Sequence, residues 1–255
     1  MKYLPNARDE ELFLAAYRAR LPALLKGPTG VGKSHFVEHM AGRIGRPLIT
    51  VACHEDLTAA DLVGRYLLEG DQTVWVDGPL TAAARQGAIC YLDEVVEARP
   101  DTVVVLHPLM DHRRELHIER LGQTLHAADG FMLVLSYNPG YQNLSKDLKA
   151  STRQRLVAFE FDFPSAEFEQ RILTEGHGLP SEVARPLVQL AQALRRHPVE
   201  GAMEAVSTRA LIAAGQLNRT GIPLREALLA TMARALTDDP TVSAALAESI
   251  DTYLR

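Results

Sequence analysis

The chain has 255 residues, of which 47% are apolar, 23% charged and 6% aromatic. This composition excludes a mainly disordered, collagen-like or coiled-coil protein, and the length predicts two domains or one domain with an appendage. The formal charge of 27 − 32 = −5 disfavours a nucleic acid partner, which requires a concentrated basic face. The apolar runs are far shorter than the roughly 18 residues of a membrane-spanning helix, so no membrane partner is expected.

The first predicted elements alternate between helices and strands. Apolar residues at helical spacing predict helices over 12–20, 33–44 and 56–63. The short apolar segment 21–26 and the β-branched segment 47–53 predict strands between them. Alternation of this kind is typical of an α/β fold with a parallel sheet.

The middle of the chain adds two predicted hairpins. Two strand-like runs flank a turn within 66–77, and a second pair lies within 114–126 with its bend near Leu121-Gly122. Between the hairpins we expect a helix over 79–86, a strand over 88–92 and a helix over 101–110 despite its valines.

The last predicted strands lie over 131–137 and 156–163. The five strands outside the hairpins predict a mostly parallel five-stranded sheet covered on both faces, an αβα sandwich. After Pro164 the chain is rich in Ala and Leu, and four or five short helices are expected. The predicted domains are therefore an αβα domain over 1–165 and a small helical domain over 166–255.

Two cysteines bear on the cellular location. Cys53 and Cys90 show no metal-ligand spacing, and each lies in a predicted strand, so buried free thiols are expected. Residues 1–10 lack the apolar stretch of a secretory signal. Both observations favour a reducing, cytoplasmic setting.

The strongest motif is GPTGVGKS, which follows a predicted strand, precedes a predicted helix and matches G-x-x-x-x-G-K-[ST]. Glycines let successive N–H groups point at a phosphate chain, the lysine faces the β- and γ-phosphates, and the serine hydroxyl can reach Mg²⁺. ATP and Mg²⁺ are the expected ligands, and a glycine turn with surface side chains is the alternative. The predicted phosphate-binding residues are Gly27, Pro28, Thr29, Gly30, Val31, Gly32, Lys33 and Ser34.

Two further motifs follow predicted strands. The strand AICYL ends in Asp93, expected to bind nucleotide and metal together with Ser34, and in Glu94, expected to polarise the attacking water. The strand ending in Tyr137 is followed by Asn138, whose amide could hold that water or the γ-phosphate. Parallel strands end on one side of a sheet, so these groups should meet. A solvated strand end and an Asn-Pro turn are the simpler alternatives.

Three arginines complete the candidate catalytic set. Arg153 and Arg155 precede the fifth strand, and Arg209 begins a helix of the second domain. A guanidinium is a fixed cationic fork that fits phosphate oxygens, so the first two could act on a neighbour's γ-phosphate and the third could report the nucleotide state. Ordinary surface arginines are the alternative.

One motif is interpreted as a decoy. His35, Glu38 and His39 match H-x-x-E-H, a spacing that can bind zinc. The segment belongs to the helix that follows the phosphate loop, and a zinc site would need a third ligand, so we do not expect a zinc site here.

Taken in order, these motifs resemble the MoxR branch of the AAA+ ATPases, and within it the CbbQ/NorQ/GpvN group, with CbbQ the nearest type. The resemblance rests on the runs 27–41, 46–70, 77–99, 133–142 and 147–164 and weakens after about residue 165. It implies a P-loop fold with a helical lid, Walker B at Asp93 and Glu94, and sensor 1 at Asn138. It also implies finger candidates at Arg153 and Arg155, with Arg155 favoured, and sensor 2 at Arg209.

The same resemblance implies partners. Members form rings, usually homo-hexamers, with active sites at subunit boundaries and hairpin inserts that face the pore or a partner. They work with an adaptor that carries a von Willebrand factor A domain. The CbbQ type, with its CbbO adaptor, removes inhibitors from rubisco, and the NorQ type serves nitric oxide reductase maturation. A remodelling ATPase with rubisco as client is thus the leading hypothesis, beside a NorQ-like role, a small-molecule P-loop kinase, a non-hydrolysing assembly module and a DNA translocase.

Overall fold

The computed structural model describes residues 3–4, 7–139, 148–202 and 205–254. It divides the chain into two compact units. The N-terminal unit comprises residues 5–28 and 32–161, and the C-terminal unit comprises residues 162–255 with 1–4 and 29–31.

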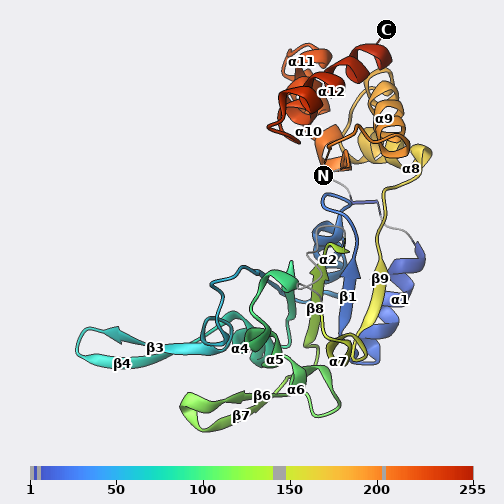
Figure 1. Ribbon diagram of the computed structural model, residues 1–255. Coiled ribbons are helices and arrows are strands. Elements are labelled where there is room, and N and C mark those ends of the chain that lie inside the picture. The colour runs from blue at the N-terminus through green and yellow to red at the C-terminus, as the bar shows by residue number, and fades with distance from the viewer. Residues whose placement is uncertain (1–2, 5–6, 140–147, 203–204, 255) are drawn as a thin grey trace. The chain divides into compact units, whose positions relative to one another are not determined.

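The N-terminal unit is built on a five-stranded sheet, shown with its helices in Figure 1. The strand order is β2-β5-β8-β1-β9, and each neighbouring pair is parallel. The strands are β1 (Ala23–Lys26), β2 (Leu48–Ala52), β5 (Ile89–Asp93), β8 (Met132–Tyr137) and β9 (Val157–Glu160). The predicted α/β class and five-stranded parallel sheet are confirmed.

Helices cover the two faces of this sheet. On one face α4 (Pro79–Gln86) packs on alternate strand residues such as Cys90 and Leu133. On the other face lie α1 (Ala7–Arg18) and α2 (Lys33–Ile44), whose Phe13 and Phe36 rings meet with centroids 5.4 Å apart. The order helix, sheet, helix is the predicted sandwich.

Glycines fix the ends of two helices where they were predicted. The helix α2 begins after Gly32, which has φ 101°, and ends at Gly45 in a left-handed conformation. The helix α4 begins with Pro79 and ends at Gly87, also left-handed. Only glycine adopts this conformation without strain, so these boundaries can be located from sequence.

The predicted helix over 101–110 is wrong. The structure has two short helices instead, α5 (Pro100–Val104) and α6 (His107–Met110). The β-branched residues Val103–Val105 and the proline at position 108 both disfavour one continuous helix. A 3-10 turn, η1 (Val95–Glu97), joins β5 to this region, and α3 (Ala59–Val63) precedes the first hairpin.

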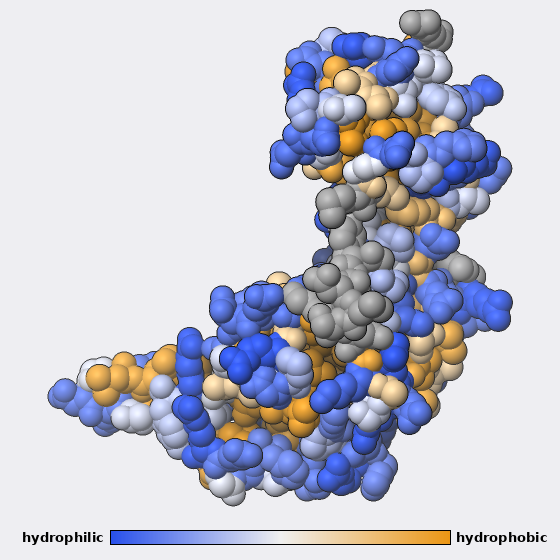
Figure 2. Space-filling model, viewed as in Figure 1, coloured by the Kyte–Doolittle hydropathy of each residue, from blue (hydrophilic) through white to orange (hydrophobic). Residues whose placement is uncertain are grey.

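Both predicted hairpins are present, and Figure 1 shows them projecting from the sheet of the N-terminal unit. The first pairs β3 (Gly64–Glu69) with β4 (Gln72–Asp77), and the second pairs β6 (Glu115–Ile118) with β7 (Gln123–His126) across η2 (Glu119–Leu121). The first hairpin exposes apolar side chains, with Leu68 at 77%, and Figure 2 shows this apolar surface.

The C-terminal unit is helical over its described residues from position 162 onward, as predicted. Its α-helices are α8 (Ala166–Arg171), α9 (Ser181–Arg196), α10 (Thr208–Arg219), α11 (Leu224–Leu228) and α12 (Pro240–Tyr253). The first continues as a π-turn, Ile172–Gly176, and the fourth as another, Leu229–Ala233. They enclose a core of their own around residues such as Leu187, Leu211 and Met232. Within the described residues, no helix has the length and apolar character to cross a membrane.

Candidate active site

The phosphate loop leaves the carboxyl end of β1 and enters α2. Gly27 lies so close to the Phe161 carbonyl that a Cβ at this position would clash with it. Gly32 supplies the left-handed turn and has no side chain to cap the helix. The positive end of α2 is therefore directed at the loop, as an anion site requires.

Lys33 is almost completely buried at the base of this loop. Its Nζ donates hydrogen bonds to the carbonyl oxygens of Gly27, at 2.6 Å, and of Pro28, at 3.0 Å. The same atom lies 4.0 Å from Glu94 Oε1. The ammonium thus lies between the loop and the Glu94 carboxylate, where a phosphate chain could take over its hydrogen bonds.

Asp93 is the last residue of β5, the neighbour of β8, and Glu94 follows it. The Asp93 carboxylate accepts a hydrogen bond from Ser34 Oγ at 3.2 Å, so the two groups expected to hold Mg²⁺ are adjacent. A hydroxyl and a carboxylate are hard oxygen donors of the kind that Mg²⁺ prefers, and this pair fits that ion. Glu94 has a left-handed backbone, φ 52° and ψ 50°, which turns the chain sharply after the strand.

Burial raises the pKa of Glu94, and the nearby Lys33 charge opposes this shift. The Asn138 main chain also hydrogen-bonds the Glu94 carboxylate and lowers its pKa. A half-buried carboxylate with a raised pKa is a better proton acceptor than an exposed one once it is ionised. Asn138 and Glu94 are therefore in contact, as expected for residues that directly follow the neighbouring strands β5 and β8.

Two residues that the sequence analysis did not select complete this corner. The Tyr91 hydroxyl donates to Asp93 Oδ1 at 2.7 Å, and Ser136 Oγ donates to the same oxygen at 2.5 Å. Burial raises the pKa of Tyr91, so this hydroxyl remains a donor. The available signal was a hydroxyl within each of two largely apolar strands, AICYL and LVLSY.

The finger candidates lie elsewhere in the N-terminal unit. Arg153 ends α7 (Ala150–Arg153), and Arg155 follows it, hydrogen-bonded to the Ser151 carbonyl. Both side chains are exposed. Both precede β9, which is parallel to β1, so they lie at the amino edge of the sheet, whereas the phosphate loop leaves the carboxyl edge. The four-residue strand β1 separates these edges by about 13 Å.

Arg209 belongs to the C-terminal unit. It is exposed in the first turn of α10, whose N-cap Ser207 accepts a hydrogen bond from the Ala210 N–H. The preceding Thr208 is buried and donates to the Glu169 carboxylate at 2.7 Å. The start of this helix is therefore fixed by internal bonds of its own unit.

The remaining polar candidates have structural roles. His39, from the H-x-x-E-H segment, hydrogen-bonds Glu10 at 2.6 Å and so joins α1 to α2. Across the described residues, no group of three or more His, Cys, Asp or Glu side chains is placed to bind a metal. Cys53 and Cys90 are free and buried, as predicted.

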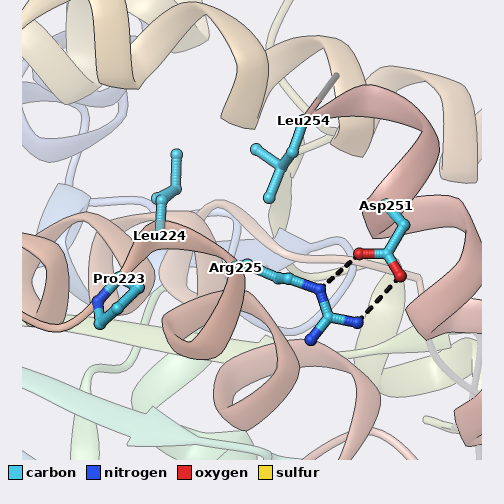
Figure 3. Close-up of a pocket in the computed structure, with 5 residues that line it drawn as sticks. All are labelled: Pro223, Leu224, Arg225, Asp251 and Leu254. Carbon is cyan, nitrogen blue, oxygen red and sulfur yellow. Dashed lines mark hydrogen bonds and ion pairs between the residues drawn. The ribbon is translucent and has the colours of Figure 1, made fainter.

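A surface hollow of the C-terminal unit, drawn in Figure 3, is a weaker candidate. It is lined by Pro223, Leu224, Arg225, Asp251 and Leu254. The Arg225 guanidinium donates two hydrogen bonds to the Asp251 carboxylate, at 2.5 and 2.9 Å. The two charges of this lining thus neutralise each other, and we assign no ligand to it.

Comparisons with known proteins found matches along most of the chain. Residues 22–156 match the family model of the AAA domain (dynein-related subfamily), and residues 169–253 match the CbbQ/NirQ/NorQ C-terminal domain. Protein NorQ of Paracoccus denitrificans is 57% identical over 96% of this chain and 90% of its own length. The denitrification regulatory protein NirQ of Pseudomonas aeruginosa is 55% identical over 99% and 97%, and protein CbbQ of Hydrogenophilus thermoluteolus is 52% identical over 98% and 94%.

Solved structures show the fold at low sequence identity. A protein from Cytophaga hutchinsonii is similar with a TM-score of 0.55, at 16% identity, over 95% of this chain and 80% of that one. A RuvB variant from Thermotoga maritima is similar with a TM-score of 0.58, at 13% identity, over 95% and 69%.

Proposed function

Because the chain belongs to the CbbQ/NirQ/NorQ family and is an AAA+ ATPase, we propose that it is the motor of a ring-shaped machine that remodels a client enzyme. The observation that carries this proposal is the meeting of Lys33, Ser34, Asp93 and Glu94 at one edge of the sheet. ATP binding needs the first three residues, and a second carboxylate beside them serves an attacking water.

Hydrolysis would use each side chain in one role. Lys33 would exchange its two loop carbonyls for the β- and γ-phosphates, and Ser34 and Asp93 would hold Mg²⁺, which supplies charge neutralisation on the phosphates. Glu94 would accept the proton of the attacking water, positioned with the help of Asn138.

The arginines supply the reason for a ring. Arg153 and Arg155 lie at the amino edge of the sheet, and this position supports a role on a neighbouring subunit rather than on their own phosphate loop. A homo-hexamer with shared active sites follows as a proposal, with Arg155 as the principal finger and Arg209 as the sensor of the lid. The exposed apolar side chains of the β3–β4 hairpin would contact the client or the pore.

The client is the finer part of the proposal. Likeness to CbbQ supports inhibited rubisco, reached through an adaptor with a von Willebrand factor A domain. Likeness to NorQ and NirQ, at 54–57% identity, supports a nitric oxide reductase. Purified protein, ATP and the adaptor should restore one of the two enzymes, measured as carboxylation by inhibited rubisco or as active reductase. Failure to act on either would exclude both clients.

The chemistry is tested by Glu94→Gln, with Glu248→Gln, an exposed glutamate of α12, as the matched control. Glu94→Gln should retain ATP binding and lose turnover by about 10²–10⁴-fold, the contribution of a general base. Release of labelled phosphate from γ-labelled ATP measures turnover. Transfer of the label to a metabolite would instead identify a kinase, and an unchanged rate in Glu94→Gln would remove this residue from the mechanism.

A further inference from the structure

The two oxygens of the Asp93 carboxylate have different surroundings. Oδ1 accepts hydrogen bonds from Tyr91 at 2.7 Å and from Ser136 at 2.5 Å. Oδ2 accepts one from Ser34 Oγ at 3.2 Å. The interior of the protein therefore holds one oxygen, and the other is directed toward the phosphate loop.

Ser136 also contacts the second carboxylate residue. Its side chain is fully buried in β8, and its Oγ accepts a hydrogen bond from the Glu94 N–H at 3.2 Å. Glu94 has the left-handed backbone that a non-glycine residue adopts only when its surroundings impose it. The Ser136 hydroxyl thus donates a hydrogen bond to Asp93 and accepts one from Glu94, so it contacts both residues of the Walker B pair.

Packing alone does not explain these hydroxyls. Phenylalanine and alanine would fill the same two places in the apolar strands, and a buried hydroxyl costs free energy unless it is hydrogen-bonded. The Tyr91 and Ser136 oxygens also lie 3.0 Å from each other, so a bond between them could satisfy part of their need. Tyr91 has a single proton, however, and its shortest contact is the 2.7 Å one to the carboxylate.

We propose that Tyr91 and Ser136 are positioning residues for ATP hydrolysis. Together they immobilise Asp93 Oδ1, so that Oδ2 stays directed at Ser34 and at the cation that the two would share. Ser136 has a second task, because it also fixes the turn that presents Glu94. This inference rests on the proposed function and deepens it, since it assigns the support of a site whose ligands are Mg²⁺ and ATP.

The test separates metal affinity from nucleotide affinity in the full-length protein. Tyr91→Phe and Ser136→Ala are compared with two matched controls, Tyr17→Phe and Thr81→Val. Tyr17 lies in α1 and accepts from Arg46, and Thr81 is a buried threonine of α4 that donates to the Val63 carbonyl. Neither control touches the carboxylates.

Two readouts do not depend on turnover. Fluorescent ADP is titrated in EDTA and then at increasing Mg²⁺, and binding of Mn²⁺ with ADP is followed by electron paramagnetic resonance. In EDTA, all variants should bind ADP within about twofold of the parent. Tyr91→Phe and Ser136→Ala should each raise the half-saturating Mg²⁺ and Mn²⁺ concentrations about tenfold, the effect of losing one hydrogen bond to a charged group.

Turnover at saturating Mg²⁺ then distinguishes the orientation of Asp93 from the support of Glu94. Tyr91→Phe should recover the parental rate, because the Tyr91 hydroxyl contacts Asp93 and Ser34, the two residues that would hold the cation, and has no hydrogen bond to Glu94. Ser136→Ala should remain slower, because Glu94 has lost its main-chain support. Melting curves identify any variant that fails to fold, and Tyr91→Phe, which removes a single oxygen, is the variant expected to keep the fold.

The outcomes distinguish the inference from its premise. If the parent protein binds ADP without any effect of Mg²⁺ and does not hydrolyse ATP, the proposed function is wrong. If the parent behaves as an ATPase while Tyr91→Phe and Ser136→Ala require no more Mg²⁺ than the two controls, the positioning role is wrong. A rise of about tenfold in the half-saturating Mg²⁺ concentration of the controls would also overturn the positioning role, because the effect would then not be specific to residues that contact Asp93.

Discussion

A buried ion pair in the C-terminal unit allows a quantitative prediction. Glu169 of α8 is fully buried, and its carboxylate accepts two hydrogen bonds from Arg195 of α9, both at 2.8 Å. It accepts a third from Thr208, at 2.7 Å, at the start of α10. Arg195 is 8% exposed and also stacks on the Phe163 ring. One carboxylate therefore joins three helices.

The magnitude follows from the burial of both charges. Glu169→Gln keeps the volume but leaves the Arg195 guanidinium without its counter-charge, and breaking a buried pair in this way costs about 3–5 kcal/mol of stability. Arg195→Met leaves the buried Glu169 carboxylate without its counter-charge and should cost a similar amount of stability. The double variant contains no orphaned charge, so its loss should be smaller than the sum by about 1–3 kcal/mol.

Urea unfolding followed by circular dichroism measures these differences, with Glu248→Gln as the control. Glu248 is an exposed residue of α12, and its change should stay within about 0.5 kcal/mol. The reasoning fails if Glu169→Gln unfolds at the same urea concentration as the control. It also fails if the two single changes add up in the double variant, because the pair would then have no coupling.

Three further predictions concern the N-terminal unit. Burial raises the pKa of Glu94 above its usual 4.5, so the ionised base is lost at a higher pH than for an ordinary glutamate. The acid limb of the pH–rate profile should therefore have its midpoint above pH 4.5. A midpoint at or below this value contradicts the burial argument. Arg155→Ala should lower turnover of the assembled protein at least about tenfold and leave the ATP affinity unchanged. The control is Arg18→Ala, on the exposed surface of α1. Normal turnover in Arg155→Ala would reject an active site shared between subunits. Burial raises the pKa of Cys53 and Cys90 to about 12, so iodoacetamide at pH 8 should label them only in urea, and fast labelling of the folded protein would show that they are accessible.

Local signals in the sequence were sufficient for most elements of the fold. Glycines flank both 33–44 and 79–86, and Pro79 begins the second, so both helices could be located to the residue. The helix predicted over 101–110 failed because its valines are apolar at helical spacing and yet disfavour a helix. In this segment the apolar spacing favours one helix, whereas the backbone preference of the valines disfavours it, and the structure follows the backbone preference.

The meeting of four polar side chains at one edge of the sheet was predictable for a different reason. Lys33, Ser34, Asp93 and Glu94 occur in short motifs whose spacing already fixes their geometry at the end of a strand. Tyr91 and Ser136 have no such motif. Their meeting depends on β5 and β8 being neighbours in the sheet, and the order β2-β5-β8-β1-β9 is a property of the whole domain.

Glu169 shows the same limitation in the helical unit. In the segment AEFEQR it resembles the exposed acid of an amphipathic helix, and its partners come 26 and 39 residues later in the chain. Burial of a carboxylate is tolerable only because those partners supply three short hydrogen bonds. The residues expected to act on ATP are thus encoded in local motifs, whereas Tyr91, Ser136 and Glu169 meet their partners through tertiary contacts. Substitutions at Ser136 or Glu169 would accordingly be judged mild from sequence, yet the first should weaken Mg²⁺ binding about tenfold and the second should cost about 3–5 kcal/mol of stability.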